Sequence, residues 1–380
     1  MNLIRLISIL AATSFAAAGP IYTLTDLGTL GGSSAMATGV NSFGQTVGTA
    51  MTIFGYIHAF SSSGSGLTDL TVNSAATQGQ AAAINDAGQI AGTQYFGGQT
   101  YATVWNNGIA ANVGGAGSYA FAINNAGAVA GMLVNNGQGS AFVALNGTVI
   151  DLGAVSGSSW SAAYGLNDAG DVTGTYMTAG GGFRAFLWTP AQGYVDLGTL
   201  GGASSYGTAI NASGSIAGSS QVSSGYSHAF IANGSSMKDL GTLGGVASYA
   251  YGINDAGNAV GYSWIGGNAV THGFLEEGGV MWDMNALIDA PGWVVTQLYA
   301  INGSNQIVGT GVLNGVEHAV LLTDPPAPGP TPSGSSDVPE PAAWICTCAG
   351  LAAIFLRKKQ VGRTPWSAAD PPIGPRGFIA

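Results

Sequence analysis

Positive charge is scarce in this sequence. Lysine and arginine together number 8 in 380 residues, and Arg184 and Lys238 alone lie between Gly19 and Glu340. A chain with so few cations cannot neutralise a run of phosphates, which argues against nucleic acid as a partner. Charged residues make up 7% and hydrophobic residues 46% of the chain. Serine, threonine, asparagine and glutamine must therefore keep it soluble.

Cysteine is almost absent as well. Both cysteines, Cys346 and Cys348, lie in an apolar C-terminal segment, so residues 19–323 have neither a thiol nor a disulfide. This composition is compatible with an oxidising compartment. The sequence also lacks a Gly-x-Ser-x-Gly elbow, a phosphate-binding glycine loop and a closely spaced pair of metal ligands. We therefore expect no cofactor and no metal ion, and no motif identifies a reaction.

What the chain does contain is a repeated ten-residue frame, seen clearly at residues 252–261. A short strand leads into an Asn-Asp-Ala-Gly turn, and a second short strand ends at a glycine. Such a frame repeated at intervals of about 43 residues is typical of solenoids and propellers. We number the repeats one to seven by the asparagine of each frame: Asn41, Asn85, Asn124, Asn167, Asn211, Asn254 and Asn302.

The turn of this frame has a defined chemistry. Asparagine at its first position and glycine at its fourth suit a type I turn closed by a left-handed glycine, a common hairpin connection. In repeat seven, Asn305 stands where the other repeats have glycine. Asparagine tolerates the left-handed conformation better than most residues, so this turn is expected to keep the same geometry.

Each repeat reads as four strands. The first ends at the asparagine, the second follows the turn, the third resembles His228–Ile231, and the fourth ends in Asp-Leu. Four short strands in 40–45 residues is the spacing of a propeller blade. Repeat seven stops after its third strand, His318–Leu322, whereas a strand of the fourth type, residues 21–27, precedes repeat one.

This arrangement of the ends predicts the fold. An array with an extra fourth strand in front and a missing one behind can close on itself without an open edge. We therefore predict an all-β fold in which residues 19–323 form one seven-bladed β-propeller, closed by the N-terminal strand. An open β-solenoid is the alternative.

The two ends of the chain have the composition of targeting segments. Residues 1–18 read as a signal peptide, with Arg5, an apolar run to Phe15 and the small residues 16–18. Residues 324–337 form a spacer rich in proline, glycine and serine.

A three-part segment follows at residues 338–359. Its parts are Val338, Pro339, Glu340 and Pro341, then an apolar run at 342–356, then Arg357, Lys358 and Lys359. An apolar run ending in basic residues is a stop-transfer pattern whose basic end stays inside. As a helix this run would measure about 22 Å, shorter than the roughly 30 Å hydrocarbon core of a bilayer. An atypical tail, residues 360–380, comes last.

Two parts of the sequence resemble known families. The order of parts in residues 338–359 resembles the PEP-CTERM sorting signal of Gram-negative bacteria that produce exopolysaccharide. With the signal peptide, it implies cleavage by signal peptidase, a transient inner-membrane anchor and processing by an exosortase at the cell envelope. The repeats, residues 21–323, resemble the extracellular HAF repeat family, named for the His-Ala-Phe found at 58–60 and 228–230. That resemblance implies an architecture and a location but no activity.

The histidines are expected to be structural. All four begin the third strand of a repeat, a slot filled elsewhere by Tyr101, Ser140 and Arg184. A third strand lies about 10 Å outside the innermost one, while zinc needs its ligands about 2 Å from one point. The aspartates that end fourth strands are expected to accept hydrogen bonds from loop N–H groups. The histidines are His58, His228, His272 and His318, and these aspartates are Asp26, Asp69, Asp151, Asp196, Asp239 and Asp283.

An acid/base pair for catalysis should appear once and out of register with the repeats. The candidates are Asp171, Glu276, Glu277, Asp289 and Glu317, and nothing in the sequence brings two of them together. We expect no enzyme, with a propeller-type glycan hydrolase or lyase as the alternative function.

Aromatic side chains are the more suggestive group. Connections between second and third strands share one face of a propeller, and aromatics exposed there among small polar residues suit sugar stacking or contact with a partner. We expect an exported protein of the cell envelope or exopolysaccharide matrix that binds a glycan or another surface, or else a purely structural surface protein. Residues 19–341 hold two basic against seventeen acidic residues, a formal charge of −15, so a polysaccharide partner should be neutral or weakly charged. The candidate residues are Tyr56, Tyr95, Tyr176, Tyr226 and Trp264.

Overall fold

The computed structural model describes residues 22–324, apart from residues 65, 73–75, 154 and 156–157. Every regular element in these ranges is a β-strand, with the exception of one 3-10 turn, η1 (Met284–Ala286). The prediction of an all-β domain is therefore confirmed. The predicted C-terminal helix, residues 342–356, lies outside the described residues.

Repeats two to six each form a separate four-stranded antiparallel sheet within the described ranges. In every one of these sheets the strands lie in the order of the chain. The sheets are β6 (Gln78–Ile84), β7 (Ile90–Phe96), β8 (Gln99–Asn106) and β9 (Ile109–Ala116); β10 (Ser118–Ile123), β11 (Val129–Asn135), β12 (Gln138–Leu145) and β13 (Thr148–Asp151); β14 (Ser161–Leu166), β15 (Val172–Met177), β16 (Phe183–Thr189) and β17 (Gly193–Asp196); β18 (Gly201–Ile210), β19 (Ile216–Val222), β20 (Ser227–Asn233) and β21 (Ser236–Asp239); β22 (Gly244–Ile253), β23 (Ala259–Ile265), β24 (Thr271–Glu277) and β25 (Val280–Asp283).

Repeats one and seven share an eight-stranded sheet. Its two groups of strands meet at a single parallel pair, Ser34 opposite Glu317. The N-terminal strand β1 pairs antiparallel with β28, from Thr23 opposite Thr323 onward, and so supplies the fourth strand that repeat seven lacks. The strands of this sheet are β1 (Thr23–Gly28), β2 (Gly31–Val40), β3 (Thr46–Thr52), β4 (Ile57–Ser62), β5 (Thr68–Asp69), β26 (Trp293–Ile301), β27 (Ile307–Leu313) and β28 (Val316–Thr323).

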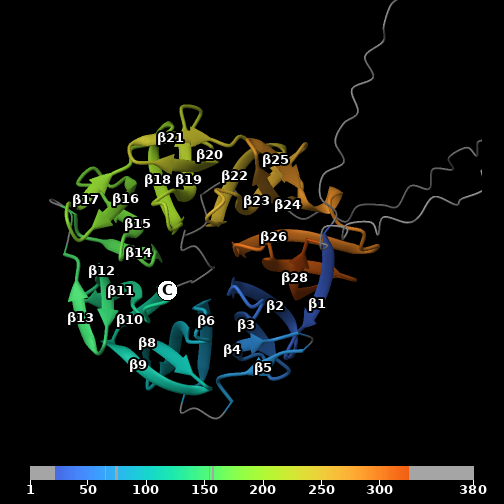
Figure 1. Ribbon diagram of the computed structural model, residues 1–380, viewed down its shortest axis with the longest axis horizontal. Coiled ribbons are helices and arrows are strands. Elements are labelled where there is room, and N and C mark those ends of the chain that lie inside the picture. The colour runs from blue at the N-terminus through green and yellow to red at the C-terminus, as the bar shows by residue number, and fades with distance from the viewer. Residues whose placement is uncertain (1–21, 65, 73–75, 154, 156–157, 325–380) are drawn as a thin grey trace, which may run out of the picture. The chain divides into compact units, whose positions relative to one another are not determined.

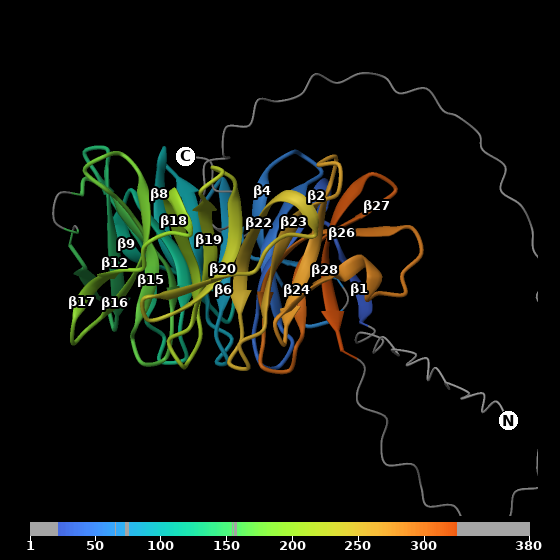
Figure 2. The same ribbon diagram turned by 90° about the horizontal axis from the view of Figure 1, so that it is seen from above.

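The sheets follow one another around a common centre, and within each sheet the strands run from the inside outward (Figure 1). Seen from the side, the connections emerge on two opposite faces (Figure 2). Antiparallel four-stranded sheets set radially in this way are the architecture of a β-propeller.

The hairpin turns have the predicted geometry. In repeat one, the Gly44 N–H donates to the Asn41 carbonyl at 3.1 Å, and the Asn41 N–H donates to the Gln45 carbonyl at 3.1 Å. Gly44 is left-handed with φ 76°, and Asn305 takes the same conformation in repeat seven with φ 56°. The type I turn with a left-handed fourth residue is therefore confirmed, including its Asn exception.

Hydrophobic packing lies between neighbouring sheets, and the third strand shows why. Side chains alternate between the two faces of a strand, so Ala59 and Phe60 point in opposite directions. Ala59 packs in a cluster with Trp105 of repeat two, whereas Phe60 packs in a cluster with Val308 of repeat seven. Both are fully buried. The Ala-Phe part of the motif thus joins the sheet of repeat one to both of its neighbours.

Candidate functional site

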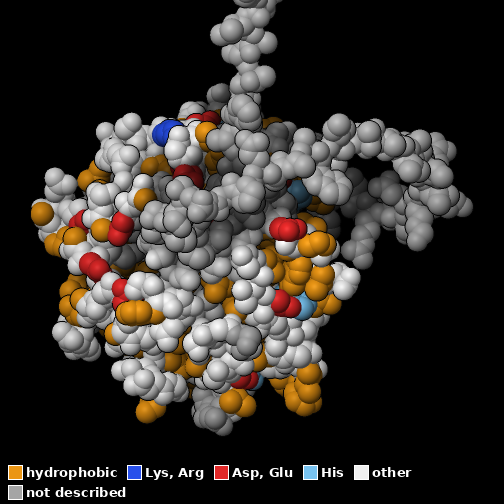
Figure 3. Space-filling view, turned by 45° about the vertical axis from the view of Figure 1, so that its right-hand side comes forward, with side chains coloured by type: hydrophobic (Ala, Val, Ile, Leu, Met, Phe, Trp, Pro, Cys, Tyr) orange, Lys and Arg blue, Asp and Glu red, His pale blue; other side chains and the backbone are white. Residues whose placement is uncertain are grey.

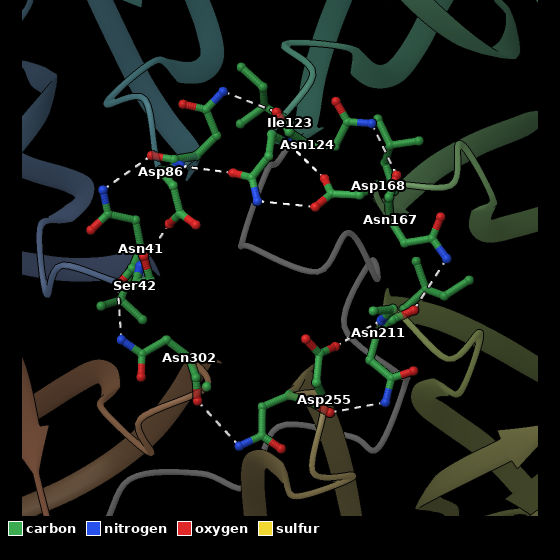
Figure 4. A pocket seen from close by; sticks show the side chains of 18 of the residues that line it. Asn41, Ser42, Asp86, Ile123, Asn124, Asn167, Asp168, Asn211, Asp255 and Asn302 are labelled. Carbon is green, nitrogen blue, oxygen red and sulfur yellow. Dashed lines mark hydrogen bonds between the residues drawn. The ribbon is translucent and has the colours of Figure 1, made fainter.

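The seven frame asparagines form a continuous circle of hydrogen bonds among the described residues (Figure 4). The side-chain Nδ2 of Asn41 donates to the Asn85 carbonyl at 3.1 Å, and the Nδ2 of Asn302 donates to the Asn41 carbonyl at 2.8 Å. We call this circle the asparagine ring. In the other five bonds of the ring, the Nδ2 of one asparagine likewise donates to the carbonyl of the next. These bonds are Asn85 to Asn124, Asn124 to Asn167, Asn167 to Asn211, Asn211 to Asn254 and Asn254 to Asn302.

The side-chain oxygen of these asparagines explains why the residue is asparagine. In repeat three, Asn124 Oδ1 accepts from the Ala128 N–H at 2.9 Å, which fixes the turn of its own hairpin. Asn124 is 6% exposed. The position therefore needs one acceptor and one donor on a short, buried side chain. Aspartate lacks the donor and leucine lacks both groups.

A cavity of about 350 Å³ opens at the asparagine ring. Asp86, Asp168 and Asp255, one from every second repeat, also line it (Figure 4). Each carboxylate accepts from a backbone N–H of the preceding repeat, as when Asp86 Oδ1 accepts from Ser42 N at 2.9 Å. These carboxylates therefore link neighbouring turns. No group of three or more His, Cys, Asp or Glu side chains in the described part of the chain could hold a metal ion.

The histidines are structural, as the sequence predicted. Each one bonds the aspartate at the end of the fourth strand in its own sheet, and the aspartate also accepts from loop N–H groups, as Asp239 does from Gly241 N at 2.8 Å. Figure 3 shows histidine atoms lying against carboxylate atoms on the face it presents. The Nδ1 to carboxylate distances are 2.7 Å for His58 and Asp69, 2.9 Å for His228 and Asp239, 2.7 Å for His272 and Asp283, and 2.9 Å for His318 and Asp26.

Three of the five acids that are out of register have separate partners. Glu276 is 4% exposed and pairs with Lys238 Nζ at 3.2 Å, across the boundary of repeats five and six. Glu277 accepts from Asn258 Nδ2 at 2.9 Å. Asp171 accepts from Asn167 Nδ2 at 3.2 Å. These contacts give the acids structural roles.

Three of the five candidate aromatics are exposed. Tyr56, Tyr95 and Tyr226 expose 54%, 40% and 48% of their surface, and Trp264 is half-buried. Tyr176 does not belong with them. It is 8% exposed, and its hydroxyl donates to Asp196 Oδ2 at 2.9 Å. Burial, aided by that hydrogen bond, raises the pKa of Tyr176 to about 12.

Two exposed tyrosines occupy equivalent turns. In repeat one the Gly55 N–H donates to the Thr52 carbonyl, and in repeat five the Gly225 N–H donates to the Val222 carbonyl in the same way. Both glycines are left-handed, and a tyrosine follows each. The turns differ at their tips. Repeat one carries Ile53 and Phe54, which are 70% and 79% exposed, and repeat five carries Ser223 and Ser224 at the matching positions.

The remaining predicted residues lie outside the described ranges. These include the signal peptide, the spacer and the sorting residues Val338, Pro339, Glu340, Pro341, Arg357, Lys358 and Lys359. Within the described ranges, no helix has the length and apolar character needed to cross a membrane.

The chain is similar to known proteins in fold alone. No protein-family model matches the chain, and no curated protein matches it. Among solved structures it is similar to puromycin hydrolase, with 12% identity, TM-score 0.52, and 78% of this chain against 53% of that one covered.

Two further similarities are to TolB from Acinetobacter baumannii, with 11% identity, TM-score 0.42, and 74% against 64% covered, and to the β-propeller domain of the Trilobed protease from Pyrococcus furiosus, with 10% identity, TM-score 0.49, and 77% against 96% covered. The chain thus spans about half to two thirds of the first two proteins. At these identities the similarity concerns the β-propeller fold alone.

Proposed function

We propose that this chain is an exported interaction module without catalytic activity: a seven-bladed propeller, closed by β1, that holds a neutral glycan of the cell envelope or matrix. It enters the export route by its signal peptide and is sorted by an exosortase. The observation that carries the binding role is the set of exposed aromatics Tyr56 and Tyr226, in second-to-third-strand turns, and Tyr95, near the end of β7.

Four contacts support closure of the ring. The asparagine ring returns from Asn302 to Asn41. The strand β1 pairs with β28, and His318 of β28 bonds Asp26 of β1 at 2.9 Å. A hydrophobic cluster that includes Val308 and Phe60 also spans repeats seven and one. Burial of such a cluster removes the apolar edge that an open array would expose.

Composition supports a neutral ligand. Sugar rings stack on aromatic faces, and their hydroxyls bond neutral polar side chains. With a formal charge of −15 between residues 19 and 341, the module repels polyanions at low ionic strength. Single stacking contacts are weak, so several blades acting together supply the retention.

The test applies the full-length chain to an array of neutral and anionic glycans and to the matrix of the producing cell. We expect binding to neutral glycans, and at least a tenfold loss in the variant Tyr56→Ala, Tyr95→Ala, Tyr226→Ala, Trp264→Ala at an unchanged melting temperature. Equal retention by that folded variant would contradict glycan binding and would support a purely structural surface protein. Shortening of the glycan during the assay would instead support a hydrolase or lyase.

The chain itself offers a matched variant. Changing Ile53 and Phe54 to serine gives the turn of repeat one the two tip residues of the repeat-five turn, Ser223 and Ser224, so its backbone should be preserved. If the tip contacts the partner, this exchange weakens binding, and the reverse exchange at Ser223 and Ser224 strengthens it. A surface that binds by the tyrosines alone would respond to neither exchange.

Sorting is tested separately, by the intact mass of protein recovered from the cell surface. We expect a C-terminus near Pro339–Pro341, because the resemblance at residues 338–359 implies removal of the apolar run. Recovery of the mature chain with residues 342–356 attached would refute processing, and the tail at 360–380 would be the first segment to remove.

A further inference from the structure

A second cavity, of about 660 Å³, lies between repeats one and two, away from the asparagine ring. It is lined by Thr68 and Asp69 at the end of β5 and by Gln94, Phe96 and Asn112 of repeat two. Its volume falls within the range of small-molecule sites, roughly 300–1,000 Å³.

Repeat two departs from the pattern of the other repeats at this cavity. Cross-strand pairing places Asn112 opposite Thr103, whereas repeat one has Asp69 opposite Phe60. Tyr101 fills the histidine slot and stacks on Phe96 at 4.1 Å. The repeat has therefore exchanged a phenylalanine for a smaller threonine and replaced the His–Asp pair by neutral groups.

Repeat two also holds polar atoms without partners. Of the five buried side-chain polar atoms that lack a hydrogen bond in the described residues, those of Thr93, Gln94 and Trp105 belong to β7 and β8. Gln94 is 4% exposed, and its Nε2 is one of them. An unsatisfied buried group costs about 1–3 kcal/mol, and departures from local consistency concentrate where a protein functions.

The lining selects the chemistry of the ligand. Its single charged group among the described residues, Asp69, is engaged by His58 Nδ1 at 2.7 Å and by two backbone N–H groups. Asn112 Oδ1 accepts from Thr103 Oγ1 at 3.2 Å, and its Nδ2 has no hydrogen-bond partner among the described residues. The cavity thus combines neutral amide and hydroxyl groups with the apolar side chain of Phe96, and it offers no cation to an anion.

We propose that this cavity is a subsite for one neutral sugar unit, held by the amides of Gln94 and Asn112 beside Phe96. The inference rests on the proposed function, because it names a binding pocket for the same class of ligand. Gln94 reorients its amide about its terminal torsion, a soft two-fold rotation, to bond a sugar hydroxyl.

Gln94→Leu and Thr93→Val form the decisive pair of variants. Both remove a buried polar atom that has no partner, so both should melt at or above the temperature of the wild type. Thr93 is the neighbouring residue of the same strand and does not line the cavity. Asn112→Ala is a third variant, at an exposed position where folding is not at risk.

The full-length chain and these variants are titrated calorimetrically with the neutral oligosaccharide that the wild type binds most tightly on the array. We expect at least a tenfold loss of affinity in Gln94→Leu, a severalfold loss in Asn112→Ala, and wild-type affinity in Thr93→Val. Wild-type affinity in both Gln94→Leu and Asn112→Ala overturns the subsite and leaves the proposed function standing. A wild type that binds no neutral glycan overturns both.

Discussion

The asparagine ring makes a sharp prediction about a change of one group, Asn302→Asp. Asn302 is 8% exposed, and its Nδ2 donates to the Asn41 carbonyl at 2.8 Å and to Gln306 Oε1 at 2.7 Å. Aspartate keeps the acceptor that fixes the turn. It replaces the donor by an oxygen that faces a carbonyl oxygen.

The magnitude follows from these contacts. The substitution leaves the buried Asn41 carbonyl with the Gly44 N–H as its remaining donor and removes the donor to Gln306 Oε1, which costs about 1–3 kcal/mol. Partial burial of the new charge adds to this, so the sum is on the order of 3 kcal/mol. About 300 residues at roughly 2.1 cal/mol/K each give an unfolding entropy near 0.6 kcal/mol/K, so the melting temperature should fall by about 5 °C.

Scanning calorimetry of the full-length chain measures this shift. The control is Asn233→Asp, the same chemical change at an exposed amide that serves as an acceptor for Ser215 Oγ. We expect the control to shift the melting temperature by about 1 °C or less. Equal shifts in the two variants would mean that the ring donor contributes nothing and that our account of the asparagine is wrong.

Three further predictions concern other contacts. Deleting residues 20–27 should expose the edge of β28 and lower the melting temperature of the whole domain; equal melting would argue for an open array. Lys238→Met should destabilise by about 1–2 kcal/mol in denaturant titration, because Glu276 stays buried without its partner, and Glu276→Gln should recover much of this loss. Burial above all raises the pKa values of Tyr176 and Tyr194 to about 12, while an unfolded tyrosine titrates near 10. Their contribution to the free energy of unfolding is therefore complete below pH 10 and is lost as pH rises toward 12. An alkaline titration that follows tyrosinate absorbance and unfolding together checks this.

Local sequence patterns predicted much of the fold. The turn at Asn41–Gly44 could be predicted because its geometry depends on two residue types within four positions. The structural role of His58 could be predicted from its repeated position. The identity of its partner, Asp69, could not, because it depends on the register between the third and fourth strands.

Contacts that are particular to one repeat could not be predicted from the sequence. Tyr176 was predicted to be a surface aromatic in a loop. It lies in strand β15 instead, and its buried side chain donates a hydrogen bond to Asp196 on the outer strand of the same sheet. Gln94 gave no signal, because a polar residue on a strand is unremarkable until its burial and missing partner are known. The cavity between repeats one and two depends on which side chains become neighbours in the fold, so the sequence alone does not predict it.

The glycine that ends each frame shows the same dependence on packing. A Cβ added to Gly218 would lie 2.0 Å from the Tyr206 carbonyl oxygen. The cause is a bulge between Gly207 and Ala209 in the innermost strand, which brings that strand close to its neighbour. The equivalent glycines meet a carbonyl at 1.9–2.1 Å in every repeat: Gly48, Gly92, Gly131, Gly174, Gly261 and Gly309.

This geometry separates two reasons for glycine in one hairpin. Gly214 has φ 81° but open space around its Cβ position, so Gly214→Ala should cost about 1 kcal/mol of backbone strain. Gly214→Asn should be nearly neutral, since Asn305 fills that place in repeat seven. The Cβ added in Gly218→Ala would clash with backbone that cannot move without disrupting the bulge, so this substitution should cost on the order of 3 kcal/mol. Denaturant titration ranks the three variants, and a Gly218→Ala protein as stable as Gly214→Asn would show that the bulge is not what requires glycine there.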